Sequence, residues 1–198
     1  TDGNSSGAQR YFHLSVDLPK ASRLSSHCAR CPRGDVQLRS DAPLRIEQVA
    51  FAHPDAQHLV EAVQNEYVVR YGSRDETPME HGDLDPPDGR FYVMYQDIPV
   101  ACGAWRWRDG VTFEGLGPAA EIKRMYVLPD ARHRGLAREL LAHLETAARS
   151  EGAAVMVLET GTAQPEAIGL YEASGYWPME PFGFYSNSTL ARYYGKVL

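Results

Sequence analysis

Apolar residues recur along this chain at two spacings, and the change from one spacing to the other separates strands from helices. Alternating or continuously apolar runs, typical of strands, cover residues 44–49, 90–95, 98–107, 121–127, 154–159 and 192–197. Recurrence every three or four residues predicts helices over residues 53–72, 135–151 and 165–174. The predicted order is strand, helix, three strands, helix, strand, helix, strand. That order indicates an α/β fold of the mixed (α+β) kind, with a mixed sheet flanked by helices.

Local signals mark the ends of these helices. Asp55 is placed to cap the first helix, and Gly72 is placed to end it. The second helix has the clearest apolar stripe of the chain, formed by Leu136, Leu140 and Leu144.

Residues 1–42 differ from the rest because they are polar, interrupted by Pro and Ser, and without a helical or strand period. We expect a poorly ordered N-terminal extension over 1–42 and one folded domain over 43–198. The extension contains Cys28 and Cys31 in the segment HCARC. A CxxC pair indicates zinc or redox chemistry only with further ligands, and no second CxxC follows. We therefore expect no metal site, and a zinc-binding adaptor is the weakest of the functions considered.

The bulk composition excludes several classes of function. The net charge of −6 over 198 residues argues against a protein that binds the nucleic-acid backbone. No apolar run is long enough to cross a bilayer, and no signal-peptide pattern opens the chain, so no membrane partner is expected. Three cysteines are few and odd in number, which favours a reducing compartment, the cytoplasm.

A cationic stretch, RHRGLARELL at residues 132–141, opens the second helix. The amides of residues 132–137 are expected to be unpaired at the positive end of the helix dipole, which suits a phosphate or pyrophosphate. Arg132 and Arg134 add charge, while Gly135 and Ala137 allow a close approach. Such a stretch binds nothing in most proteins, and it matches neither the GxGxxG nor the GxxxxGK[ST] pattern.

Two other segments, one before this stretch and one after it, favour a functional interpretation of the stretch. Residues 132–137 resemble the Arg/Gln-x-x-Gly-x-Gly/Ala signature of the GCN5-related N-acetyltransferases (GNAT). EIKRMYVLP at 121–129 resembles the family's fourth strand, and QPEAIGLYEASGY at 164–176 resembles its Asn-x-x-Ala-x-x-Leu-Tyr-x-x-x-Gly-Phe block. The resemblance covers about residues 43–198. It implies the GNAT fold with splayed parallel strands, and transfer of the acetyl group of acetyl-CoA to a primary amine by direct attack on the thioester.

The resemblance also implies a coenzyme site. The loop residues Arg132, His133, Arg134, Gly135, Leu136 and Ala137 would cradle the pyrophosphate of coenzyme A, His133 through its backbone alone. The backbones of Met125 and Val127 would bind the pantetheine arm and the acetyl carbonyl, although both residues also suit a plain core strand. Gln164 stands where relatives often carry an Asn that touches the coenzyme, and this departure puts the contact in doubt.

Two residues are candidates for the chemistry. Tyr171 matches the family tyrosine that donates a proton to the leaving thiolate, and the alternative is a core tyrosine. Glu121 precedes Gly135 by the interval of the catalytic glutamate in histone-type members. An amine with a pKa of about 10.4 costs about 4.6 kcal/mol to deprotonate at pH 7, so a base is needed. The alternative is that Glu121 pairs with Lys123 or Arg124 on the sheet surface.

The acceptor site in this family is built from the first helix, the loop after it and the middle strands. Here these elements supply Tyr67, Tyr71 and Trp105 as predicted substrate-binding residues, together with Glu66, Trp107 and a loop containing Glu76, Glu80, His81, Asp83 and Asp85. Carboxylates and aromatic faces suit a small cationic amine, although solvated surface charge explains the loop equally well. A second copy of the chain, in a homodimer, is the one macromolecular partner considered. The competing function is a non-catalytic acyl-CoA sensor or interaction module on the same fold, which has no need of Tyr171 or Glu121.

Overall fold

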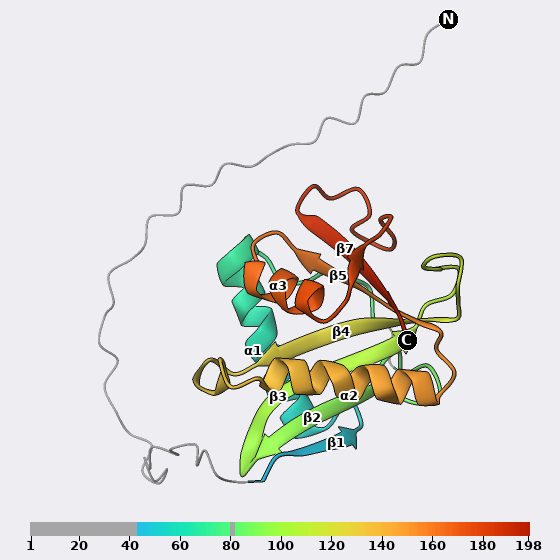
Figure 1. Cartoon of the computed structure of the whole chain (residues 1–198). Helices are drawn as coiled ribbons and strands as arrows, with labels where there is room; N and C mark the ends of the chain where they lie inside the picture. Colours follow the sequence, from blue (N-terminus) through green and yellow to red (C-terminus); the bar gives the residue numbers. More distant parts are fainter. Residues whose placement is uncertain (1–42, 80–81) are drawn as a thin grey trace, which may run out of the picture. The chain divides into compact units, whose positions relative to one another are not determined.

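The computed structural model describes residues 43–79 and 82–198 (Figure 1). Residues 1–42, with Cys28 and Cys31, and residues 80–81 lie outside the described part of the chain. The predicted extension therefore stays a prediction.

The described residues form one seven-stranded mixed sheet, which confirms the predicted class of fold. Its spatial order is β1 (Arg45–Val49), β2 (Gly89–Gln96), β3 (Ile98–Trp107), β4 (Ala119–Val127), β5 (Val155–Gly161), β7 (Ala191–Val197) and β6 (Trp177–Pro178). Strands β4 and β5 pair in parallel, and the other neighbours pair antiparallel. The two-residue β6 is the one strand of the sheet that the hydrophobic pattern does not predict.

Helix α1 (Pro54–Tyr71) begins one residue earlier than its expected cap. His53 is the N-cap, and its Nδ1 accepts a hydrogen bond from the Asp55 amide at 3.2 Å. Asp55 was expected in that role, but Pro54 takes the first helical position and places Asp55 inside the first turn. Gly72 ends the helix in the left-handed conformation (φ 81°), as predicted.

Helices α1 and α2 (Leu136–Ser150) cover opposite faces of the sheet (Figure 1). The predicted stripe of α2 is buried in a core cluster with Tyr92 and Met94 of β2. The alternate β2 residues Phe91 and Val93 pack instead with Leu59 of α1. A strand with both faces covered is apolar throughout, which explains why β2 shows little alternation. Helix α3 (Pro165–Ala173) follows β5.

Strands β4 and β5 separate part-way along their length. Their parallel register spans Ala119–Glu121 of β4 and Val155–Val157 of β5. Beyond it β4 continues to Val127 and β5 to Gly161 without a shared register, so the two strands splay apart. The splay that the family resemblance implies is therefore present.

A β-bulge lies in β4 at the start of the splayed part. Cys102 and Ala104 of β3 pair with Tyr126 and Lys123, so β4 holds one extra residue there. Arg124 occupies the bulge with a φ of 54°. Ile122 and Met125 both pack with the cluster under α2, so the two residues between them, Lys123 and Arg124, are displaced together toward the other face.

Candidate functional site

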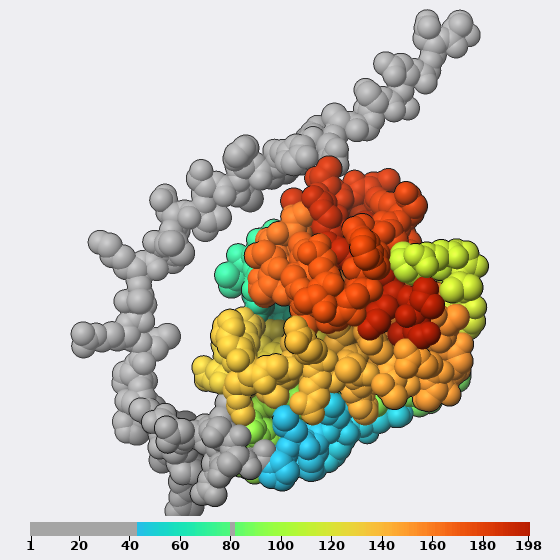
Figure 2. All heavy atoms as spheres, viewed as in Figure 1, coloured from blue at the N-terminus to red at the C-terminus, as the bar shows by residue number. Residues whose placement is uncertain are grey.

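A cavity of about 250 Å³ opens where β4 and β5 diverge. Figure 2 shows a recess between the loop before α2 and the segment of β5 and α3. The wall of the cavity comes from five parts of the chain: the end of α1, the loop after α1, the splayed halves of β4 and β5, helix α3, and the segment before β7. Tyr171, from the segment 164–176 that carries the family resemblance, therefore meets the two splayed strands.

Tyr171 reaches this cavity from α3. Its hydroxyl lies 3.8 Å from Sδ of Met125, across the gap between α3 and β4. The side chain is 7% exposed, and burial raises the pKa of Tyr171 above its ordinary value. A phenol in this setting stays protonated at neutral pH, which is the state that a proton donor requires.

The loop between β4 and α2 presents free amides. A 3-10 turn (Pro129–Ala131) follows β4, and the amide of Arg132 donates to its first carbonyl at 3.2 Å. The amides of residues 133–137 donate to no other described residue. His133 and Gly135 have φ values of 60° and 82°, which turn this run of donors around the start of α2. One predicted donor, the Arg132 amide, is thus already used, and five remain to suit a pyrophosphate.

The two arginines of the loop have different roles. Arg132 Nε donates to the Val127 carbonyl at 2.9 Å, and its guanidinium forms an ion pair with Glu66 of α1. It also lies 5.5 Å from the ring centroid of Tyr126. These contacts tie the loop to β4 and α1. Arg134 is exposed and has no ion pair with a described residue, so its charge is available to an anion.

The other predicted coenzyme contacts differ in their surroundings. Met125 lines the cavity, whereas Val127 and Leu136 are buried and Ala137 packs against the core, so their side chains act in packing. Gln164 precedes α3 and folds onto its own loop. Its Oε1 accepts from the Gly161 amide and from the Tyr71 hydroxyl, each at 3.4 Å.

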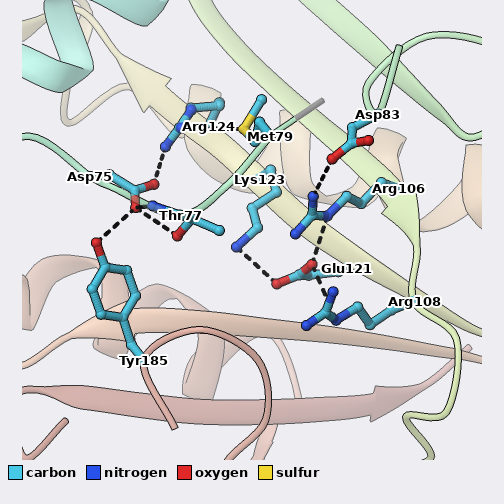
Figure 3. A network of polar contacts seen from close by, with 10 residues as sticks. All are labelled: Asp75, Thr77, Met79, Asp83, Arg106, Arg108, Glu121, Lys123, Arg124 and Tyr185. Atoms are coloured by element: carbon cyan, nitrogen blue, oxygen red, sulfur yellow. Dashed lines mark hydrogen bonds and ion pairs between the residues drawn. The ribbon is translucent and has the colours of Figure 1, made fainter. Parts of the chain in front are cut away.

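Glu121 does not reach the cavity. It is 2% exposed, and its carboxylate lies 2.9 Å from Arg106 Nε and 2.8 Å from Lys123 Nζ (Figure 3). Burial raises the pKa of Glu121, but these two cations outweigh burial and the net pKa is lowered. The expected pairing with Lys123 is present, but the second partner is Arg106 and not Arg124, and the pair is buried and not on the sheet surface. This geometry gives no support to the expected role of general base.

A different carboxylate, Glu159, lies in the cavity wall. It ends the apolar run of β5, half-buried, on the splayed half of the strand. Burial raises its pKa to about 7, partly opposed by Lys123 and reinforced by Asp75 and Glu121. The sequence interpretation missed this residue, although a single acidic residue at the end of a continuously apolar strand was a signal for it.

The predicted acceptor residues are only partly brought together. Tyr67 and Tyr71 line the cavity, with ring centroids 6.4 Å apart. Trp105 is 0% exposed and packs edge-on to Trp107, with ring centroids 5.2 Å apart, in the core under α2. Trp105 does not line the cavity.

The acidic loop contributes less than expected, because two of its carboxylates have partners elsewhere. Asp83 pairs with Arg106 at 2.6 Å, and Asp85 accepts from the Phe51 amide at 2.8 Å. Glu80 and His81 lie outside the described residues, and Glu76 does not line the cavity.

Asp75, which was not among the predicted residues, does line the cavity, paired with Arg124 and contacted by the Tyr185 hydroxyl at 3.2 Å (Figure 3). Tyr185 belongs to the segment before β7, so this contact connects the loop after α1 to the C-terminal part of the chain.

The described residues contain no group of three or more His, Cys, Asp or Glu side chains placed to hold a metal ion. In the same part of the chain, no helix has the length and apolar character needed to span a membrane.

Comparison with known proteins agrees with this geometry. Residues 56–176 match the family model described as acetyltransferase (GNAT) family. An IAA acetyltransferase of Azospirillum brasilense is 36% identical over 116 residues, 58% of this chain and 72% of the relative. An uncharacterised N-acetyltransferase of Bacillus subtilis is 29% identical over 97 residues, 49% of this chain and 61% of the relative.

Solved structures are similar over most of the described chain. A candidate acyl-CoA N-acyltransferase of Klebsiella pneumoniae, 26% identical, has a TM-score of 0.62 over 78% of this chain and 97% of its own. An IAA acetyltransferase of Bacillus cereus shares the fold at 18% identity, with a TM-score of 0.54 over 79% of this chain and 100% of its own. The family model covers more than half of the sequence, and this chain therefore belongs to the GNAT family of acetyltransferases.

Proposed function

We propose that the chain transfers the acetyl group of acetyl-CoA, the co-substrate of its family, to the primary amine of a small molecule. The observation that carries this proposal is the cavity between β4 and β5, whose wall contains both Glu159 and the protonated Tyr171. The free amides of residues 133–137 lie at the end of the same splayed strand, where the pyrophosphate would bind.

The two side chains account for the protons of the reaction. As the acceptor nitrogen attacks the thioester carbonyl, a C–N bond forms and the C–S bond breaks. Glu159 takes the proton that the nitrogen loses, and Tyr171 gives one to the departing sulfur. A base with a pKa of about 7 is half ionised at pH 7 and can still accept a proton.

A non-catalytic acyl-CoA sensor remains the competing function. A sensor has no need of Tyr171 or Glu121, but Glu121 is held in an ion-pair network that any protein of this fold could keep for stability. The distinction now depends on Tyr171 and Glu159, because both face the cavity.

Calorimetry with acetyl-CoA and a thiol-release assay over a panel of amines test the proposal. Tyr171→Phe should lower turnover about 100-fold or more while acetyl-CoA still binds, since general acid catalysis contributes at least that much. Tyr176→Phe is the matched control, because Tyr176 is equally buried, packs against Tyr171 and does not line the cavity. Binding of acetyl-CoA without thiol release for any amine would favour the sensor.

A further inference from the structure

Positive charge is in excess beside the cavity. The network of Figure 3 contains the cations Arg106, Arg108, Lys123 and Arg124 and the carboxylates Asp75, Asp83 and Glu121. Asp75 pairs with Arg124 alone. Arg106, Arg108 and Lys123 share two carboxylates, Asp83 and Glu121, so one cation is in excess when Glu159 is protonated. Lys123 and Arg124 line the cavity and are 9% and 8% exposed. Water can do little to solvate the charges of these two side chains.

The hydrogen bonds of these two cations are incomplete. Arg124 Nη1 donates to Asp75, but Nη2 donates at 3.3 Å to Met79 Sδ, which is a weak acceptor. Arg124 Nε is buried and has no partner among the described residues. Lys123 Nζ has three hydrogens and, in the same part of the chain, one carboxylate partner, Glu121. Buried donors without acceptors are costly, so the wall is suited to a ligand that brings an oxyanion.

The charge balance changes during the proposed reaction. Once Glu159 has taken the proton of the acceptor amine, it is neutral, and the surplus cation of the network has no counter-charge from the protein. A simple amine supplies none, and a polyamine adds further positive charge. A carboxylate on the acceptor supplies the missing negative charge in the state that attacks the thioester.

We propose that the acceptor carries a carboxylate close to its primary amine, with the carboxylate bound by Lys123 and Arg124 and the amine facing Glu159. This inference rests on the proposed acetyl transfer and narrows its acceptor to small amino acids and related amino-carboxylates. It replaces a purely cationic acceptor, because two carboxylates of the acidic loop, Asp83 and Asp85, are held elsewhere and Glu76 does not line the cavity.

The test compares three forms of each acceptor in the thiol-release assay: the amino acid, its carboxamide and the amine that lacks the carboxyl group. The wild-type chain should prefer the amino acid over the carboxamide by about tenfold or more in kcat/KM, as expected for a charged hydrogen bond. Lys123→Met should reduce that preference to about twofold or less, since it removes one of the two cations.

Arg74→Met is the matched control for charge. Arg74 also borders the cavity, but it is exposed and its guanidinium is already paired with Glu61 at 2.7 Å. This variant should keep the wild-type preference ratio, whatever its absolute rate. A loss of preference in Arg74→Met equal to that in Lys123→Met would mean that general electrostatics, and not the Lys123 contact, sets the preference.

The outcomes separate the two proposals. Calorimetry that detects no acetyl-CoA binding would overturn both. Binding of acetyl-CoA with equal acetylation of carboxamides, polyamines and amino acids would overturn only the amino-carboxylate inference. Preference for aminophosphonates of the same length over amino acids would overturn the assignment of the anion as a carboxylate.

Discussion

Replacement of Glu159 by glutamine gives the most direct test of the electrostatics of the cavity. The ionised Glu159 carboxylate is unfavourable in the folded chain, because burial and the neighbouring Asp75 raise its pKa to about 7 from an ordinary value of 4.5. Glutamine has nearly the same shape and no charge. The variant should therefore be more stable than the wild type wherever the wild-type residue is ionised.

The sign and size of this effect follow from proton linkage. The folded chain holds the Glu159 proton up to a higher pH than the unfolded chain does, so the wild type loses stability as pH rises from about 4.5 to about 7. At 1.36 kcal/mol per pKa unit, the full difference corresponds to about 3.4 kcal/mol above pH 7. Glu159 is only half-buried, so solvent screening reduces the expected gain to about 1–2 kcal/mol.

The assay is urea unfolding of both proteins at pH 5 and at pH 8. The free energies of unfolding should be similar at pH 5, and the Glu159→Gln variant should exceed the wild type at pH 8 by the amount above. A gap that stays constant between the two pH values would refute the raised pKa and, with it, the reason for choosing Glu159 as base.

Three further predictions concern the same cavity and its loop. In the wild type, log kcat/KM should rise with pH and level off near pH 7, because Glu159 must be ionised to accept the proton; a profile flat from pH 5 to 8 would contradict this role. Gly161→Ala would place a Cβ 1.9 Å from the Tyr71 hydroxyl, so we expect about 1–3 kcal/mol lower stability in urea unfolding and a higher acceptor KM. Gly135→Ala meets no neighbouring atom but must adopt a φ of 82°, so calorimetry should show weaker acetyl-CoA binding and unfolding a loss of about 1–2 kcal/mol.

The sequence predicts the order of elements well because hydrophobic period and glycine positions act locally. Helix α2 and the strands around it follow from periodicity alone, and Gly72 ends α1 as expected. The cap of α1 was misassigned to Asp55 because Asp is a common cap and His is not, whereas Pro54 takes the first helical position and leaves His53 as the cap.

The site was harder to predict because it depends on which face of the sheet each side chain occupies. Trp105 and Arg106 are consecutive in the sequence, yet they lie on opposite faces of β3. Trp105 is in the core under α2, and Arg106 is in the polar network on the other face. Glu121 lies on β4 and Glu159 on β5, which are parallel neighbours in the sheet. Glu121 is in the part of β4 that pairs with β5, whereas Glu159 is in the part of β5 that has separated from β4. Sequence spacing gives no sign of where two strands stop pairing.

The bulge in β4 connects the fold to the proposed selectivity. An unbroken strand would send Lys123 and Arg124 to opposite faces, one of them into the apolar core under α2. The extra residue places both beside the cavity, at the expense of a left-handed backbone at Arg124, a conformation that disfavours a side chain by about 1–2 kcal/mol. Glycine would avoid that strain but could form no ion pair with Asp75. The ion pair with Asp75 offsets that strain, and the proposed contact with the acceptor carboxylate gives a reason for a charged side chain at a position that suits glycine.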